Sequence, residues 1–260
     1  MENITVIGFD GKITNTLDEY NGLSVKEARK KIIDQLQKDG LLVKTEKINH
    51  AVGHCYKCGT VIEPLLKEQW FVKMKPLVNK ALSHIEDDEI KFFPESAKRN
   101  VLNYLKNLKD WNVSRQIAWG IPIPAFQNKE DPKDWIFNTR VTEPEIEIDG
   151  KTYIREEDTF DTWFSSSQWP YITTDYLENG KNAKFYPNSV METGSDILYG
   201  WVSRMILMGV YRTGMVPFKE VYLHGMVLDE KGLKMSKSKG NVINPMEMLA
   251  KYGSDALRIG

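Results

Sequence analysis

The chain has 260 residues, which is enough for one large domain or two small ones. Its 35 lysine and arginine residues nearly balance its 36 aspartate and glutamate residues, and this excludes the global basic field of a nonspecific nucleic-acid binder. Two cysteines are too few for a disulfide scaffold, and no apolar run approaches the ~20 residues that a membrane-spanning helix needs. Because the first residues also lack a signal-peptide pattern, we expect a cytoplasmic protein with no membrane partner.

The N-terminal part of the chain carries one strong helix signal. Residues 4–22 predict short extended pieces joined by an Asp-Gly hairpin turn. Ser24 and Glu27 have capping-box spacing ahead of an apolar stripe that ends at Gly40, which predicts a helix. Residues 41–74 predict strands.

The middle of the chain combines helical and extended patterns. Leu77–Ile85 and Ser96–Leu108 alternate apolar and charged positions at helical spacing, and we expect connecting helices on the surface of a larger body. Residues 127–157 are polar, with an Asp149-Gly150 hairpin signal, and predict an inserted β-ribbon.

The C-terminal third has the order strand, helix, strand. Ser189–Glu192 and Glu220–Leu223 predict short strands, and the apolar segment Ile197–Val210 between them predicts a helix. This succession implies a parallel sheet with a right-handed crossover. A nucleotide is then expected at the carboxyl ends of the strands.

The loop after the last predicted strand has the composition of a phosphate clamp. The run 234–238, Lys-Met-Ser-Lys-Ser, lies between Gly232 and Gly240. Its ammonium and hydroxyl groups are able to close on a polyphosphate while the glycines let the backbone move. The alternative is a solvated surface loop, which is the ordinary role of a generic loop of this composition.

The order of residues in this loop resembles the KMSKS signature of class I aminoacyl-tRNA synthetases, and the match at Lys234 to Ser238 is letter for letter. The resemblance implies attack of an amino-acid carboxylate on the α-phosphate of ATP, with MgATP as a substrate and no tightly bound cofactor. Lys234 and Lys237 are then the predicted catalytic residues, because pre-placed cations stabilise the departing pyrophosphate. The predicted ATP-binding residues are Gly194, Asp196, His224, Gly225, Val227, Lys234, Met235, Ser236, Lys237 and Ser238. Asp196 has the alternative role of a helix N-cap.

Two further stretches resemble the valyl members of this family. Asp158–Pro170 contains their Asp-Thr-Trp-Phe-Ser-Ser stretch, and Met191–Met205 follows their Thr-Gly-x-Asp-Ile-x-x-x-Trp-Val-x-Arg-Met pattern. The resemblance places Trp163, Ile197 and Trp201 in a valine pocket, with Ile197 and Trp201 on one face of a helix at i and i+4. Ordinary core packing is the alternative for each of the three. The expected partners are valine, ATP and tRNA(Val).

A third stretch, Asp110–Pro124, resembles a segment near the active site of valyl, isoleucyl and leucyl enzymes. Two roles remain open for its Arg115-Gln116 pair. The pair either contacts the tRNA acceptor end or the adenylate, or it has a structural role.

Cys55 and Cys58 have the spacing of half a zinc knuckle. A structural zinc needs four ligands, and residues 125–157, where many relatives carry a second Cys-x-x-Cys, contain neither cysteine nor histidine. We therefore expect neither zinc nor another metal, with this pair as a weak candidate.

The resemblance implies an α/β fold, namely the second half of a class I Rossmann-like catalytic domain, preceded by the β-rich tail of the editing insertion and connecting helices. The His-x-Gly-His signature of the first half is absent from the sequence. We expect a fragment of a valine–tRNA ligase that is inactive alone and completed by a separate N-terminal fragment. One alternative is a truncated paralogue that binds ATP or tRNA without catalysis. Another is an isoleucyl or leucyl enzyme. The predicted domains are 1–75 (distal editing insertion), 76–126 (connecting helices and return to the core), 127–157 (β-ribbon) and 158–260 (second catalytic half).

Overall fold

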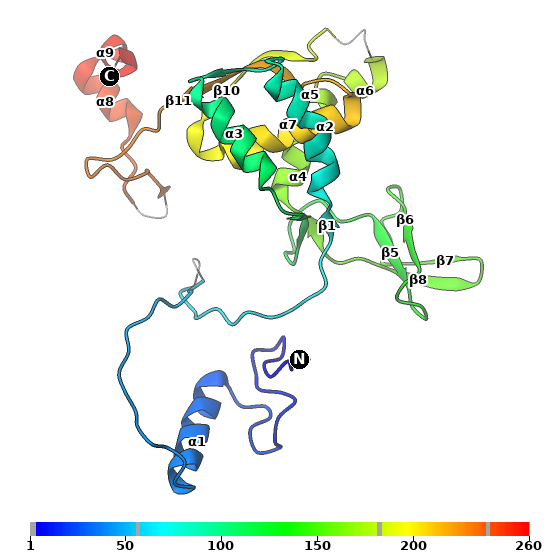
Figure 1. The fold of residues 1–260 in the computed structure, drawn as a ribbon, viewed down its shortest axis with the longest axis vertical. Coiled ribbons are helices and arrows are strands. Elements are labelled where there is room, and N and C mark those ends of the chain that lie inside the picture. The colour runs from blue at the N-terminus through cyan, green and yellow to red at the C-terminus, as the bar shows by residue number, and fades with distance from the viewer. Residues whose placement is uncertain (1–3, 56–57, 181–183, 238–239, 260) are drawn as a thin grey trace. The chain divides into compact units, whose positions relative to one another are not determined.

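The computed structural model describes residues 4–55, 58–180, 184–237 and 240–259 (Figure 1). The chain divides into two compact units, Met1–Glu68 and Gln69–Gly260. No helix in the described ranges is long and apolar enough to cross a membrane.

The first unit contains the predicted helix and the predicted turn. Helix α1 (Val25–Lys38) begins with a complete capping box, in which Ser24 Oγ accepts a hydrogen bond from Glu27 N and Glu27 Oε2 accepts one from Ser24 N. Gly11 has φ +74°, and Gly8 N donates to Lys12 O at 2.8 Å across the hairpin. Both sequence predictions are confirmed.

The strand prediction for residues 41–74 is wrong over most of its length. The described residues between 41 and 68 form only an isolated bridge, His54↔Val61, and the alternating apolar side chains there stay exposed, with Val43 97% exposed. Pairing in the described residues is limited to this bridge and its flanking hydrogen bonds, from Cys55 N to Thr60 O and from Ile62 N to Gly53 O, which is too short to build a sheet with a buried face. Only β1 (Phe71–Val72), in the second unit, forms a strand, antiparallel to β3 (Trp111–Asn112).

The second unit is built around the predicted βαβ motif. Strand β10 (Asn188–Gly194) pairs in parallel with β11 (Phe218–His224), which pairs in parallel with β2 (Lys91–Phe93). The connection from β10 to β11 contains a 3-10 turn, a π turn and helix α7 (Ser203–Thr213). The prediction of an α/β fold with a parallel sheet is confirmed, and β2 is an additional strand that the sequence patterns did not indicate.

Helices α2 (Met74–Glu86) and α3 (Ser96–Lys106) confirm the two predicted helices. Figure 1 shows them beside α7, and α2 packs against both α3 and α7. Their apolar faces belong to the same core as α7 and the sheet. Its fully buried side chains include Ala81, Ile85, Val101, Val202, Met205, Ile206 and Phe218.

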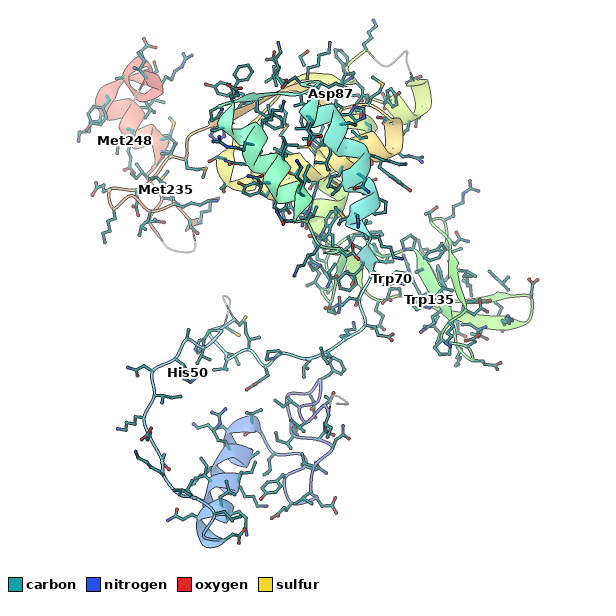
Figure 2. All side chains as sticks on the ribbon, viewed as in Figure 1. His50, Trp70, Asp87, Trp135, Met235 and Met248 are labelled. Carbon is teal, nitrogen blue, oxygen red and sulfur yellow. The ribbon has the colours of Figure 1, made fainter. Side chains whose placement is uncertain are left out.

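The polar stretch in the middle of the chain folds as a small antiparallel sheet of order β6-β5-β8-β7. Its strands are β5 (Ala125–Asn128), β6 (Trp135–Phe137), β7 (Glu145–Ile148) and β8 (Lys151–Arg155). Asp149 (φ +52°) and Gly150 (φ +74°) form the predicted hairpin turn. Trp70 packs edge-on against Trp135, with ring centroids 4.9 Å apart, so the small sheet is attached to the end of β1 (Figure 2).

The remaining elements are short. They are β4 (Ser114–Arg115), which pairs with β9 (Thr159–Phe160), and helices α4 (Thr162–Ser166), α5 (Trp169–Ile172), α6 (Tyr176–Asn179), α8 (Pro245–Tyr252) and α9 (Ser254–Ile259).

Candidate nucleotide and amino-acid site

The carboxyl ends of β10 and β11 bring three of the predicted ATP-binding residues together. Gly194 lies opposite His224 in the strand register, and Asp196 follows two residues later. A Cβ on Gly194 would lie 3.0 Å from Met226 Sδ and 3.5 Å from His224 Cε1. Only glycine therefore fits this edge without moving its neighbours, as expected where a backbone must approach a ligand closely.

The lysine loop reaches the same edge. Lys234 Nζ lies 2.5 Å from Asp196 Oδ2, although 38 positions separate the two residues. This hydrogen bond is the main cause that lowers the pKa of the Asp196 carboxyl below its ordinary value. Two residues that the sequence placed at one ATP site are thus in direct contact, and both remain accessible to solvent.

A small hydrogen-bonded frame shapes the lysine loop. Leu228 and Lys234 form an antiparallel bridge, and Asp229 Oδ1 accepts from Lys231 N at 2.9 Å and from Leu233 N at 2.8 Å. Gly232 closes the turn with φ +72°. The loop is therefore a tight hairpin.

Asn241 holds the other arm of this hairpin. Its amide nitrogen donates to Asp229 Oδ2 at 2.7 Å, and its amide oxygen accepts from Ser236 N at 2.9 Å. Met235 is half-buried, and its sulfur accepts from Ile243 N at 3.3 Å (Figure 2). These contacts hold the backbone of the loop, and the side chains of both Lys234 and Lys237 stay exposed.

The other predicted ATP-binding residues lie along the path from β11 into the loop. Gly225 and Val227 are exposed, and His224 Nε2 lies 3.5 Å from Glu192 Oε1. Ser238 lies outside the described residues.

The two tryptophans of the predicted amino-acid pocket are neighbours. Trp201 Nε1 donates to Ser166 O at the end of α4 at 3.2 Å. The Trp163 ring, which belongs to α4, lies over Gly200, since a Cβ there would be 3.8 Å from Trp163 Cζ2. Both indoles are half-buried and pack against the main core.

The prediction that Ile197 and Trp201 lie on one regular helix, at i and i+4, is wrong in the type of helix. Ile197 ends a 3-10 turn (Ser195–Ile197), and Trp201 belongs to a π turn (Leu198–Val202). The π turn is fixed because both the backbone N–H and the hydroxyl of Ser203 donate to Leu198 O, five residues back. Such π turns are frequent at functional sites. Ile197 is half-buried, four positions before Trp201.

One buried charge next to this pocket was not predicted from the sequence. The Asp161 side chain is only 7% exposed and lies 2.9 Å from Arg115 Nη2. Both residues fall inside stretches that carry the family resemblance, but no spacing rule joins positions 115 and 161. The only local signal was an aspartate two residues before a tryptophan at the start of a helix, which is an N-cap pattern.

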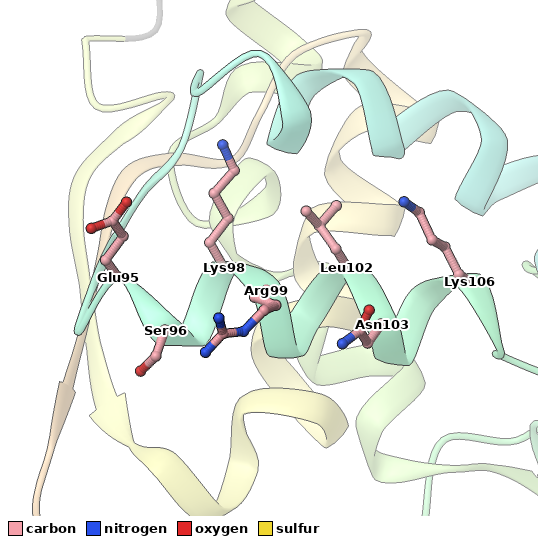
Figure 3. A pocket seen from close by; sticks show the side chains of 7 residues that line it. All are labelled: Glu95, Ser96, Lys98, Arg99, Leu102, Asn103 and Lys106. Atoms are coloured by element: carbon pink, nitrogen blue, oxygen red, sulfur yellow. The ribbon is translucent and has the colours of Figure 1, made fainter.

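A groove of about 510 Å³ on the outer face of α3 contains none of the predicted site residues (Figure 3). Lys98 and Lys106, which border it, form ion pairs with Asp88 at 2.5 Å and Glu86 at 3.1 Å. The groove is a polar helix face with paired charges, and we assign no site to it.

The cysteine pair of the first unit has an unusual thiol. Hydrogen bonds with the hydroxyl and backbone of Thr60, followed by Cys55, lower the pKa of Cys58 to about 7, and Cys58 Sγ lies 3.3 Å from Thr60 Oγ1. Within the described ranges, no three His, Cys, Asp or Glu residues are grouped so as to hold a metal ion. The expectation that no metal binds here stays a prediction.

A family model described as tRNA synthetases class I (I, L, M and V) matches residues 9–260. The chain belongs to this family. Among curated relatives, it is 44% identical to the valine–tRNA ligase of Fusobacterium nucleatum over 98% of the chain, and 44% identical to that of Petrotoga mobilis over 99% of the chain. The chain spans 29% and 30% of the length of these two relatives. The resemblance to valyl enzymes that the motifs indicated is confirmed.

Solved structures agree on the fold of the family. The structure of methionyl-tRNA synthetase from Mycobacterium tuberculosis in complex with methionyl-adenylate matches 82% of this chain and 36% of that chain, with a TM-score of 0.53 and 20% identity. A second structure of that enzyme, bound by methionyl-adenylate, gives a TM-score of 0.51 at 19% identity over 80% of this chain and 35% of that chain. At such identities the likeness concerns the fold alone.

Proposed function

We propose that this chain supplies the ATP-clamping loop and the valine pocket of a valine–tRNA ligase. The observation that carries the proposal is the contact between Lys234 and Asp196, which joins the KMSKS loop to the segment that leads into the Trp201 pocket wall. The 44% identity to valine–tRNA ligases over nearly the whole chain supports valine as the amino acid.

In the proposed reaction, the carboxylate of valine attacks the α-phosphate of ATP, which enters with Mg²⁺. Valyl-adenylate forms and pyrophosphate leaves; the valyl group then passes to tRNA(Val). Lys234 and Lys237 stabilise negative charge on the leaving pyrophosphate, so catalysis rests on positioning and electrostatics rather than on a covalent nucleophile. Asp196 accepts hydrogen bonds from the ribose hydroxyls, and Gly194 lets the backbone approach the nucleotide.

In the same proposal, Trp163, Ile197 and Trp201 wall the valine side chain. A cup of this kind accepts an isopropyl group and rejects a longer side chain by overpacking, which discriminates by about 1–3 kcal/mol per methylene. Discrimination of this size is modest. Valyl enzymes as a class reject threonine by only about a hundredfold at such a pocket, a known value for the family, and they therefore need editing at a second site.

The domain limits also stay proposals. We assign 1–75 to the distal editing insertion, 76–126 to the return into the core, 127–157 to an insertion, and 158–260 to the second catalytic half. The segment that carries the His-x-Gly-His signature in the family completes the catalytic domain in this proposal, and the assembled enzyme acts in the cytoplasm.

Amino-acid-dependent exchange of pyrophosphate into ATP tests the proposed function. We define the assembled enzyme as this chain together with the N-terminal catalytic segment that carries His-x-Gly-His in the family. Valine is expected to support exchange by the assembled enzyme but not by the chain alone. Exchange with isoleucine or leucine in preference to valine, or binding of ATP without any exchange, would contradict the proposal.

A further inference from the structure

Asp161 is a buried carboxylate with an unusual number of partners. Its Oδ2 accepts from Trp111 Nε1 at 3.0 Å and from Arg115 Nη2 at 2.9 Å, and Arg204 Nη1 lies 4.0 Å away. Its backbone N–H donates to Val113 O at 2.7 Å. A buried charge with this many fixed partners is costly to disturb, since removing it leaves its partners unpaired.

The same carboxylate also contacts the backbone of Trp163. Asp161 is the N-cap of α4, and its Oδ1 accepts from Trp163 N at 3.3 Å. Helix α4 has only five residues. Because so short a helix is not stable by itself, its start depends on the cap and on tertiary contacts. Phe164, the next residue, packs its ring on Phe160 with centroids 4.5 Å apart.

Asp161 reaches Trp201 through Arg204. The Arg204 guanidinium lies over the Trp111 ring, 4.0 Å from its centroid, and donates to Gly200 O at 3.3 Å. Gly200 directly precedes Trp201 in the π turn, and the Trp163 ring lies over it. One carboxylate is thus linked to both indole walls, directly to Trp163 and through one guanidinium to Trp201.

We propose that Asp161 is a positioning residue that sets the spacing between Trp163 and Trp201, and with it the selectivity of the amino-acid pocket. The part about selectivity rests on the proposed function, whereas the part about geometry does not. Replacement by asparagine keeps an acceptor for Trp163 N but removes the charge that faces Arg115 and Arg204. The Arg204 guanidinium is then no longer attracted to a negative charge beside Trp111. It becomes free to move, and the Gly200 carbonyl loses a fixed hydrogen-bond donor.

The geometric part is tested on the 260-residue chain itself by nitrogen-15 NMR of the indole N–H groups, assigned with single Trp→Phe variants. Asp161→Asn is expected to shift the indole signals of both Trp163 and Trp201 and to leave that of Trp135 unchanged. Asp134→Asn is the matched control, because Asp134 is also a hydrogen-bonded carboxylate, paired with Lys151 at 3.1 Å in the small sheet. It should leave Trp163 and Trp201 unchanged. Unmoved Trp163 and Trp201 signals in Asp161→Asn would overturn the proposal.

The selectivity part is tested in the assembled enzyme by pyrophosphate exchange with valine and with 2-aminobutyrate, which lacks one methyl group. A pocket of this type separates such a pair by about 10–200-fold. Asp161→Asn is expected to reduce this ratio about fivefold or more while the KM for ATP changes less than about twofold, and Asp161→Glu, which keeps the charge, is expected to restore part of the ratio. A merely structural role would raise both KM values together, and that result, or an unchanged ratio, would refute the assignment.

Arg204→Lys provides a second variant in case Asp161→Asn does not fold. It keeps a positive charge but loses the planar stack on Trp111 and the fixed bond to Gly200 O. The same loss of selectivity with a normal KM for ATP is expected, and normal selectivity would contradict the proposal. If the wild-type assembled enzyme performs no valine-dependent exchange, the proposed function fails, and the indole signals still decide the geometric part.

Discussion

Lys234 Nζ donates a hydrogen bond to Asp196 Oδ2 at 2.5 Å, at the carboxyl edge of the parallel sheet. One belongs to the KMSKS hairpin and the other to the 3-10 turn after β10, so their ion pair joins the loop to the candidate nucleotide site. A nucleotide that used both residues would have to exchange this pair for bonds to ribose and phosphate. The contact thus holds the loop against the edge of the sheet where Asp196 lies.

Replacing Asp196 is expected to weaken ATP binding. A hydrogen bond to a charged group contributes about 1.5–3 kcal/mol, so Asp196→Asn in the assembled enzyme should raise the KM for ATP roughly tenfold or more. Glu192→Gln is the control, since Glu192 is an exposed carboxylate on β10, the strand that precedes the turn of Asp196. Equal effects of the two changes on exchange kinetics would argue against a specific role of Asp196.

The ion pair also has a defined pH dependence. The hydrogen bond from Lys234 lowers the pKa of Asp196, so the carboxylate stays charged at neutral pH and the pair is lost only as the pH falls through the lowered pKa. In NMR titrations of the carboxyl carbons, Asp196 should titrate at lower pH than in the Lys234→Ala variant. Identical midpoints in the two proteins would show that Lys234 does not contact Asp196 in solution.

Lys237 should matter for chemistry far more than a lysine of the same hairpin outside the signature. Loss of one pre-placed charge-stabilising group typically costs about 10²–10³-fold in rate, so Lys237→Ala should reduce the kcat of exchange by about that factor. Lys231→Ala, a lysine in the same hairpin but outside the signature, is the matched control and should stay within about twofold. Near-normal rates in Lys237→Ala would remove the phosphate-clamp assignment.

Gly194 and Gly225 form a second matched pair. A Cβ on Gly194 would lie 2.8 Å from Asp196 Oδ1 and 3.0 Å from Met226 Sδ, whereas a Cβ on Gly225 would meet no described atom within 4 Å. Both close atoms end flexible side chains, so Gly194→Ala should fold but displace the Asp196 carboxylate. We expect a several-fold rise in the KM for ATP with Gly194→Ala and a smaller rise with Gly225→Ala, because the added Cβ of the latter displaces no neighbouring protein atom; thermal denaturation is measured alongside. The reverse order would contradict the described packing of this edge.

Cys58 offers a test in the first unit. Hydrogen bonds with Thr60 lower its pKa to about 7, so its alkylation by iodoacetamide should rise with pH around a midpoint near 7. Thr60→Val removes the hydroxyl and should move the midpoint toward the ordinary thiol value of about 8.5. A wild-type midpoint already at that value would show that the Thr60 contact does not form.

The sequence patterns were sufficient where structure is local. The capping box at Ser24, the Asp149-Gly150 turn and the alternation of strand, helix and strand in the C-terminal third each depend on neighbouring residues, and each is observed. The strands expected over 41–74 failed because a strand is stabilised by pairing, which a local pattern does not specify.

In the candidate site, too, local patterns were predictable and long-range contacts were not. The motifs identified Lys234 and Asp196, but only the fold reveals that they touch. The π turn at Leu198–Val202 overrode the helical spacing assumed for Ile197 and Trp201, because Ser203 bonds to a carbonyl five residues away. Asp161 was missed since its partners lie far from it along the chain.

Calorimetric titration of the assembled enzyme with a non-hydrolysable valyl-adenylate analogue tests most directly whether the lysine loop and the indole walls serve one site. The analogue should bind much more tightly than either valine or an adenosine analogue alone, and both Asp196→Asn and Trp201→Ala should weaken it. Binding no tighter than that of the adenosine analogue, or binding that is unaffected by Trp201→Ala, would contradict the account.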